Sequence, residues 1–482
     1  MKKNRHESAM GTLNPVRSKV TKWVAALAGV ALLSSCASTA PAPSEQAAIP
    51  DALTGPVDLD FWHVYTGGDG EALDAVLAGF KTKYPDIKVT STFVGGYGQL
   101  RQKTVSAVRA DTPPNVVISY ETDALEYFRS DAIVDLKTYR EDPKHGLDAA
   151  SWKDILEVER TRNTYAAMKG ANLSMPWTVA DLMLAYNVDT LKKLGFSEPP
   201  KTWAEFSKIC SAAMDQLGQK CLPASTDAST FHAVAMSFGG HSFKENGAAA
   251  GFDSSAWTSA LRLYSDLAKA GQAFATTVGA GDTSTNDLAA FSSGSSPFVL
   301  RSSRLIPFID KGVGDAFTWN AAPLPQGKAT DKPTTVLFGP NLSVFSTTPD
   351  EQLASWLLVK YLMSTDAQLT WSTKTGNLPI RTSTTELSEY AQQLAGSQKL
   401  QTAVEILPFA QAEGAIGPDG LLMPGLNEMR QLIERAFESV LAGTTDVATA
   451  QSTLQSAAQP LIDQANAEMK VLSKKVGTKL DK

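Results

Sequence analysis

Alternating hydrophobic and polar positions open the folded part of the chain. Residues 57–63 alternate in this way and are rich in strand-forming side chains, which predicts a β-strand. The period becomes helical over residues 71–84, and alternation returns over residues 87–93. Residues 99–110 predict a second helix, and the apolar run 116–118 predicts a third strand. This order of strands and helices predicts a mainly parallel sheet with helices on both faces.

Two later helices carry clear start signals. Thr202 is followed three residues later by Glu205, and Thr348 is followed at the same spacing by Glu351. Each pair predicts a capping box, in which the two residues satisfy each other's free backbone N–H groups. Pro349 occupies the first helical position of the second of these helices, where its missing N–H costs nothing.

The remainder of the chain continues the alternation of predicted strands and helices. It ends in a predicted helix pair over residues 427–441 and 446 to about 472. No internal repeat of fixed period and no second low-complexity linker divides the chain. The predicted fold class is therefore α/β over the whole folded part.

The first 35 residues predict an export signal. Six basic residues precede the apolar run 23–33, which is too short to cross a bilayer comfortably as a mature helix. The segment ends in Leu-Ser-Ser before Cys36, which resembles the lipobox of bacterial lipoproteins, where the chain is cut before a lipid-carrying cysteine. The alternative is a cysteine buried in a hydrophobic segment. Residues 36–56 predict a flexible tether, so the protein is expected outside the cytoplasm, anchored by lipid to the cell membrane.

Composition and charge exclude several classes of protein. The 482 residues are 43% hydrophobic and 20% charged, which is neither a polytopic membrane protein nor a disordered chain. Six basic residues and one acidic residue precede Cys36, which leaves 38 basic against 49 acidic residues, a net charge of −11. A nucleic-acid partner is not expected, because phosphate neutralisation needs clustered basic residues.

The reactive residue types predict neither a metal site nor a cofactor. Cys210 and Cys221 favour a disulfide over two free thiols in an exported chain. The sequence lacks a Gly-x-Ser-x-Gly elbow, a His-Glu-x-x-His motif and a phosphate-binding P-loop. Four histidines are scattered without metal-ligand spacing: His63, His145, His232 and His241. No catalytic residue is predicted, although the many carboxylates leave a glycan-degrading enzyme as an alternative.

Five short motifs follow one another along almost the whole chain after the leader. They are Phe-Trp-His at 61–63, Tyr-Pro-Asp-Ile-Lys-Val at 84–89, Thr-Pro-Pro-Asn-Val-Val at 112–117, Pro-Pro-Lys-Thr-Trp at 199–203 and Thr-Gly-Asn-Leu-Pro-Ile-Arg at 375–381. In this order they resemble the extracellular solute-binding proteins of bacterial ABC importers, in the sugar and glycerol-phosphate branch. Asn115 departs from the pattern, because the family usually has an acid there.

The resemblance implies a periplasmic-binding-protein-like fold of two lobes with a ligand cleft between them. Lobe one is expected over residues 57–136 and 323–372, and lobe two over residues 137–322 and 373–475. The implied function is to bind a sugar or polyol-type solute and deliver it to the membrane permease, as a monomer. A glycerol-phosphate or glycerophosphodiester ligand is an alternative in the same role, and a lipid-anchored adhesin or scaffold is an alternative of another class.

Ligands of such folds lie beyond the carboxyl ends of strands. The resemblance therefore implies these ligand-binding residues: Gly67, Gly68, Tyr97, Glu121, Trp177, Ser302, Ser303, Gly339, Asn341 and Asn377. Tyr97 would line the cleft, Glu121 would accept hydrogen bonds from ligand hydroxyls, and Trp177 would stack on a sugar ring. A tight glycine turn, surface packing, a solvated carboxylate and a core tryptophan are the ordinary alternatives. Pro340 stands where the family has a second glycine beside Gly339, which puts a backbone contact there in doubt.

One departure from the family pattern concerns phosphate. The segment Leu-Pro-Phe at 407–409 resembles the one that precedes a phosphate-binding arginine in glycerol-phosphate binders. Residues 410–429 contain no Lys or Arg, whereas a phosphate clamp needs charged donors. This favours an unphosphorylated sugar or polyol, with Arg301 or Arg304 as possible substitutes.

Overall fold

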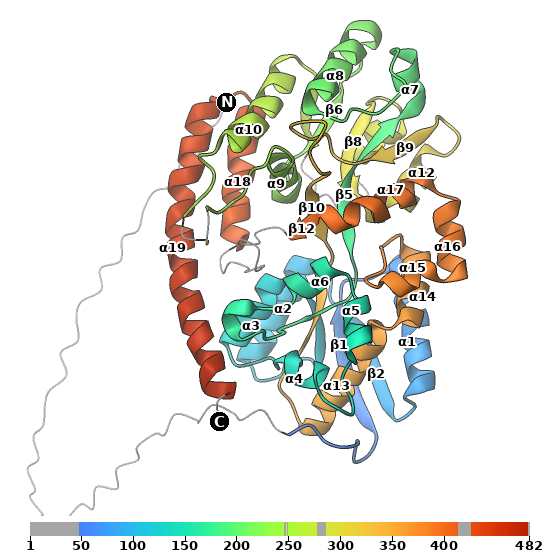
Figure 1. Cartoon of the computed structure of the whole chain (residues 1–482), viewed down its shortest axis with the longest axis vertical. Helices are drawn as coiled ribbons and strands as arrows, with labels where there is room; N and C mark the ends of the chain where they lie inside the picture. The colour runs from blue at the N-terminus through green and yellow to red at the C-terminus, as the bar shows by residue number, and fades with distance from the viewer. Residues whose placement is uncertain (1–47, 245–246, 248, 277–285, 413–425, 481–482) are drawn as a thin grey trace, which may run out of the picture. The chain divides into compact units, whose positions relative to one another are not determined.

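The computed structural model describes residues 48–480 except 245–246, 248, 277–285 and 413–425 (Figure 1). The predicted export signal, Cys36 and most of the predicted tether lie outside the described residues. The described end of the tether is attached to the folded part: the carbonyl oxygens of Pro50 and Asp51 accept from His145 Nε2 at 3.2 and 3.1 Å. The last residues of the predicted tether thus contact the folded part, and the flexibility of the tether stays a prediction.

The first sheet confirms the predicted opening of the fold. Its strands are β1 (Val57–His63), β2 (Ile87–Phe93), β3 (Val116–Ser119), β4 (Met175–Pro176) and β11 (Asn341–Val344). They lie in the order β2-β1-β3-β11-β4, and β1 runs parallel to both β2 and β3. Strand β11 is antiparallel to β3 and β4. The first three strands thus end at the same edge of the sheet.

Helices connect and cover these strands (Figure 1). They include α1 (Gly67–Lys83), α2 (Tyr97–Arg109), α3 (Glu121–Arg129), α13 (Pro349–Leu362) and α14 (Thr365–Thr375). Helix α1 begins four residues earlier than its apolar period predicts. Its first turn consists of glycines and Asp69, which contribute no apolar side chain to the period. The capping box predicted for α13 is confirmed.

The second sheet differs from the predicted parallel arrangement. It contains β5 (Ala180–Asn187), β8 (Phe298–Ser302), β9 (Trp319–Ala322), β10 (Thr335–Phe338) and β12 (Ala410–Ala412). Strands β8, β9 and β10 all pair antiparallel with β5, and only β10 and β12 are parallel. More than a hundred residues separate β5 from β8 in the chain, so the rule for directly connected βαβ units does not fix their direction.

A further pair of parallel strands, β6 (Leu222–Ser225) and β7 (Ala273–Thr276), lies outside this sheet. The structure joins Cys210, in the middle of α8, and Cys221, directly before β6, in the predicted disulfide, with their Cα atoms 5.0 Å apart. The capping box of Thr202 and Glu205 opens α8 as predicted. The longer helices of this region are α8 (Trp203–Leu217), α9 (Ala228–Ser237), α10 (Ser255–Lys269), α18 (Leu426–Leu441) and α19 (Val447–Leu480).

Shorter helices complete the described chain. They are α4 (Leu136–Arg140), α5 (Ala149–Asp154), α6 (Glu157–Arg162), α7 (Val188–Lys193), α11 (Asn286–Ser292), α12 (Ile306–Val313), α15 (Thr382–Glu386), α16 (Ser388–Ala395) and α17 (Gln398–Ile406). Helix α19 packs first beside α10 and α18, and then reaches α3, where Glu468 pairs with Arg129 at 2.7 Å (Figure 1).

The chain passes between the two sheets at residues 177–179 and again at 339–340. Residues 137–176, expected in lobe two, instead contribute β4 to the first sheet and many side chains to its hydrophobic core. Gly339 makes the second crossing possible. Its φ is +126°, and an added Cβ would meet the carbonyl oxygen of Thr178 at 1.9 Å. We propose lobe boundaries near these two crossings in place of residues 136 and 323.

Candidate functional site

A tyrosine follows each of the three parallel strands of the first sheet. Tyr65 comes two residues after β1, Tyr97 four residues after β2, and Tyr120 directly after β3. Because these strands end at one edge, the three side chains gather there; the rings of Tyr97 and Tyr120 lie 5.1 Å apart. We call this group, Tyr65, Tyr97 and Tyr120, the tyrosine edge.

Two tryptophans contact Tyr65 of the tyrosine edge on its buried side. Trp177 Nε1 donates to the Tyr65 hydroxyl at 3.0 Å, and the rings of both residues lie within 5 Å of the Trp371 ring. Trp177 has no exposed surface and Tyr65 is only 5% exposed. Burial raises the pKa of Tyr65, so its hydroxyl stays protonated. In this structure Trp177 therefore positions Tyr65, and its predicted stacking on a ligand stays a prediction.

The tyrosines differ in their access to solvent. Tyr97 is 40% exposed, whereas Tyr65 is buried and Tyr120 is half-buried. Large exposed aromatic side chains are scarce among the described residues, because most aromatic residues there belong to two hydrophobic cores. Tyr97 is accordingly the residue of the tyrosine edge with the most surface to offer a ligand.

Beside the tyrosine edge, an ion pair joins a helix that follows the first sheet's β1 to a turn that follows the second sheet's β8. Asp69 lies in the first turn of α1, and Arg304 lies in a short 3-10 turn (Ser303–Leu305) that follows β8. Arg304 Nη2 and Asp69 Oδ2 are 2.7 Å apart, and both side chains are less than a quarter exposed. The charges of both residues act on Tyr65 and Tyr97. The site thus contains a carboxylate and a guanidinium from different lobes.

Glu121 is held in a buried ion-pair network. Its Oε1 lies 2.9 Å from Arg162 Nη1, and Arg162 also pairs with Glu159 at 2.9 Å and donates to the carbonyl oxygen of Gly339 at 2.9 Å. All three charged side chains are at least nine-tenths buried. Burial raises the pKa of Glu159 to about 7, although Arg162 opposes the shift. The solvated alternative for Glu121 is therefore wrong, and its contact with a ligand stays a prediction.

Apart from Gly67 and Gly68, the other predicted ligand residues are buried, and several of them form hydrogen bonds with neighbouring parts of the chain. Ser303 Oγ accepts from the backbone N–H of Asp181 at 3.1 Å, and Asn377 Nδ2 donates to Thr375 at 2.9 Å. Ser302 is the buried last residue of β8. Asn341 Oδ1 accepts from Asn163 at 3.1 Å, while Asn341 Nδ2 lacks a partner in the described part of the chain.

Gly67 and Gly68 form the exposed first turn of α1. An added Cβ would meet nothing within 4 Å at either position, so no packing contact explains why both are glycine. Gly67 has a φ of +57°, which does favour glycine.

Comparison with known proteins decides the family. A family model of bacterial extracellular solute-binding proteins matches residues 75–396 of this chain. The chain belongs to this family. Among curated proteins, this solute-binding protein is 24% identical to the sn-glycerol-3-phosphate-binding periplasmic protein UgpB of Yersinia pseudotuberculosis, covering 80% of this chain and 88% of that one. It is 23% identical to UgpB of Brucella abortus, over 82% of this chain and 90% of that one.

Solved structures confirm the two-lobed fold of the solute-binding protein. The GacH receptor of Streptomyces glaucescens, solved unliganded and with acarbose, matches with a TM-score of 0.71 and 22% identity, over 85% of this chain and 99% of that one. UgpB from Mycobacterium tuberculosis, in complex with glycerophosphocholine, matches with a TM-score of 0.69 and 18% identity, with the same coverage.

Sequence reasoning missed four residues that the structure brings to this site. Tyr65 and Tyr120 follow strands by two residues and one residue, so their positions after predicted strands were the available signal. Asp69 lay within the predicted glycine turn. Arg430 is the first basic residue after the stretch 410–429; it donates to Ser229 at 2.8 Å, and its charge acts on Tyr120.

Among the residues that the structure describes, no three of the types His, Cys, Asp and Glu are grouped so that they can bind a metal ion together. None of their helices combines the length and the hydropathy needed to cross a membrane.

Proposed function

We propose that this chain, the solute-binding component of an ABC importer, captures a sugar or polyol-type solute at the tyrosine edge and delivers it to the membrane permease. The gathering of Tyr65, Tyr97 and Tyr120 beyond three parallel strands carries the proposal. Sugars present apolar C–H faces that bury well on aromatic rings, and hydroxyls that hydrogen-bond to phenols and carboxylates.

The ion pair of Asp69 and Arg304 supports binding between the lobes. A carboxylate accepts hydrogen bonds from two adjacent hydroxyls, and a guanidinium donates to ring or hydroxyl oxygens. Because the two side chains come from different lobes, a solute that contacts both favours the closed arrangement. Related solved structures are described with acarbose and with α-D-tagatose, which are ligands of this chemistry.

Arg430 favours a second candidate, a glycerol-phosphate or glycerophosphodiester. Its guanidinium lies within electrostatic reach of Tyr120 and thus supplies the cation that residues 410–429 lack. The curated relatives named above are called glycerol-3-phosphate-binding proteins. A phosphate bound by Arg430 adds a charge-assisted contact that a neutral sugar does not make.

A thermal-stability screen distinguishes the two candidates. The intact protein is heated with maltose-type oligosaccharides, monosaccharides, polyols, glycerol-3-phosphate and glycerophosphocholine. A ligand at about a hundred times its Kd adds roughly 2.7 kcal/mol to the folded state. We expect stabilisation by a sugar or polyol that survives in Arg430→Ala. Stabilisation by phosphate compounds alone, lost in Arg430→Ala, makes the second candidate correct. Release of a cleaved product from any glycan contradicts the proposal that the protein has no catalytic residues. The proposed binding protein is a monomer.

The proposal also includes a lipid on Cys36 that anchors the protein to the cell membrane. The Leu-Ser-Ser-Cys ending of the export signal supports it, and so does the Ala-, Pro- and Ser-rich segment that follows. We expect the intact mass of membrane-extracted protein to show a chain that begins at Cys36 and carries lipid, and Cys36→Ser to abolish the lipid. An unmodified Cys36 in membrane-extracted protein contradicts the anchor.

A further inference from the structure

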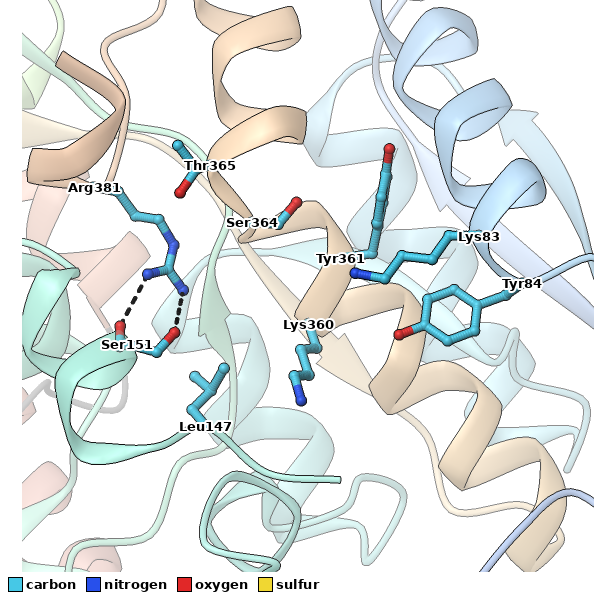
Figure 2. A pocket seen from close by; sticks show the side chains of 9 residues that line it. All are labelled: Lys83, Tyr84, Leu147, Ser151, Lys360, Tyr361, Ser364, Thr365 and Arg381. Carbon is cyan, nitrogen blue, oxygen red and sulfur yellow. Dashed lines mark hydrogen bonds between the residues drawn. The ribbon is translucent and has the colours of Figure 1, made fainter. Parts of the chain in front are cut away.

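A pocket lies in the first lobe, and no residue of the tyrosine edge lines it. Its volume is about 160 Å³, and it lies where the ends of α1, α13 and α14 meet α5. Its lining residues are Lys83, Tyr84, Leu147, Ser151, Lys360, Tyr361, Ser364, Thr365 and Arg381 (Figure 2). Three of these side chains are cationic and five carry a hydroxyl group.

The two lysines retain donors that nothing in the described chain uses. Lys360 Nζ donates to the carbonyl oxygens of His145 at 2.9 Å and Gly146 at 2.7 Å, which leaves one of its three N–H groups. Lys83 Nζ lies 5.8 Å from the Tyr84 ring and 5.9 Å from the Tyr361 ring, and has no ion pair among the described residues. Figure 2 shows Lys83, Tyr84 and Lys360 on one side of the pocket, and Arg381 with Ser151 on the other.

The charges around the pocket favour an anion between the lysines. Burial and the charge of Lys83 lower the pKa of Lys360, so each ammonium raises the electrostatic cost of the other. Asp142 and Asp148 oppose this shift, but both accept hydrogen bonds from nearby backbone N–H groups. Arg381 is paired with Asp154 at 2.9 Å. The unpaired positive charge therefore belongs to the lysine side of the pocket.

The hydroxyl groups that line the pocket are hydrogen-bond donors for those oxygens of a tetrahedral anion that the lysines do not bind. Ser364 and Thr365 stand at the start of α14, where first-turn backbone N–H groups also favour negative charge. A phosphate group has several strong acceptor oxygens, and lysine and hydroxyl donors are suited to it. A volume of about 160 Å³ accommodates a phosphate with a small substituent.

The pocket lies beside the described end of the predicted tether. The His145 ring binds the end of the tether. Its backbone carbonyl oxygen accepts hydrogen bonds from Lys360 and Trp356. Thr54 donates its backbone N–H to Asp350 in the first turn of α13 at 3.1 Å. The described end of the tether therefore contacts a residue that also binds Lys360.

We propose that this pocket binds a phosphate group, presented by a lipid headgroup at the membrane surface or by a free phosphate. The site is independent of the solute proposed for the tyrosine edge, and failure of one leaves the other intact. Neither source needs the lipid anchor for binding, although an anchor would hold the pocket near lipid headgroups.

The test uses the otherwise full-length Cys36→Ser chain, which cannot reach vesicles through an acylated cysteine. Inorganic phosphate is titrated by calorimetry into this chain and into its Lys83→Ala and Lys83→Glu variants. Lys81→Ala is the matched control, because Lys81 is an exposed lysine in the same helix turn but does not line the pocket. We expect Lys83→Ala to weaken binding about tenfold, Lys83→Glu to abolish it, and Lys81→Ala to leave it unchanged.

Vesicles separate the two sources. The same proteins are sedimented with vesicles of phosphatidylcholine alone and of phosphatidylcholine mixed with phosphatidylglycerol. Lys83-dependent binding to the mixed vesicles, competed by inorganic phosphate, identifies the headgroup source. Lys83-dependent phosphate binding without vesicle binding identifies free phosphate. Absence of phosphate binding, or equal affinity in the Lys83 variants and the Lys81 control, overturns the proposal.

Discussion

Arg162→Met is expected to lower the free energy of unfolding by about 3–5 kcal/mol, the usual cost of removing one partner of a buried ion pair. Arg162 is only 4% exposed, and it neutralises Glu121 and Glu159, which are both buried. It also satisfies the carbonyl oxygen of Gly339 at the crossing between the lobes. Urea unfolding measures the change. Arg129→Met is the control, because its pair with Glu468 is half-exposed and contributes less than about 1 kcal/mol.

The pH dependence of this variant gives a second check. The pKa of Glu159 is about 7 in the folded protein, against 4.5 for an exposed glutamate. The folded state therefore binds a proton between these values that the unfolded state does not, and stability from this group falls as pH rises through about 7. Without Arg162, ionised Glu159 has no cation beside it, so the deficit should be larger at pH 8 than at pH 5. A deficit below about 1 kcal/mol at both pH values contradicts the buried network.

Trp177→Ala is expected to lower the free energy of unfolding by a similar amount, about 3–5 kcal/mol. The side chain is fully buried, packs on Trp371 and holds the Tyr65 hydroxyl. Because it positions Tyr65, its loss should also weaken solute binding. Trp177→Phe retains most of the packing and loses the hydrogen bond, so it should cost about half as much or less.

Chemical unfolding and calorimetry on the same samples check the Trp177 prediction. If Trp177→Ala unfolds like the wild type but binds the solute more than tenfold more weakly, Trp177 is a ligand platform, as the sequence suggested. If it unfolds like the wild type and binds normally, both roles are wrong.

Local signals predicted the first lobe well and the second lobe less well. Strands β1 and β2 begin and end where the alternation of apolar residues does, and both capping boxes form. The direction of β8 and β9 relative to β5 depends on long connections, which neither period nor caps encode. The need for glycine at position 339 was not predictable either, because the carbonyl oxygen of Thr178, which leaves no room for a Cβ, belongs to a distant segment.

The site was predictable to the extent that it depends on strand ends. Tyr97 was proposed from the family resemblance and from the glycines around it, and a rule that examines every strand end would also have proposed Tyr65 and Tyr120. The partner of Glu121 was not predictable, because Arg162 is 41 positions away in the sequence and nothing local marks it. The pairing of Asp69 with Arg304 likewise depends on how the lobes meet.

The most direct test of the central claim is the affinity of Tyr97→Ala for the solute that stabilises the wild type in the thermal screen. Tyr97 is 40% exposed, so its removal should change the unliganded stability by less than about 1 kcal/mol. If the solute binds on the tyrosine edge, calorimetry should show affinity reduced about tenfold or more, as for an aromatic hot-spot residue. Unchanged affinity in a folded Tyr97→Ala protein would contradict the placement of the solute site.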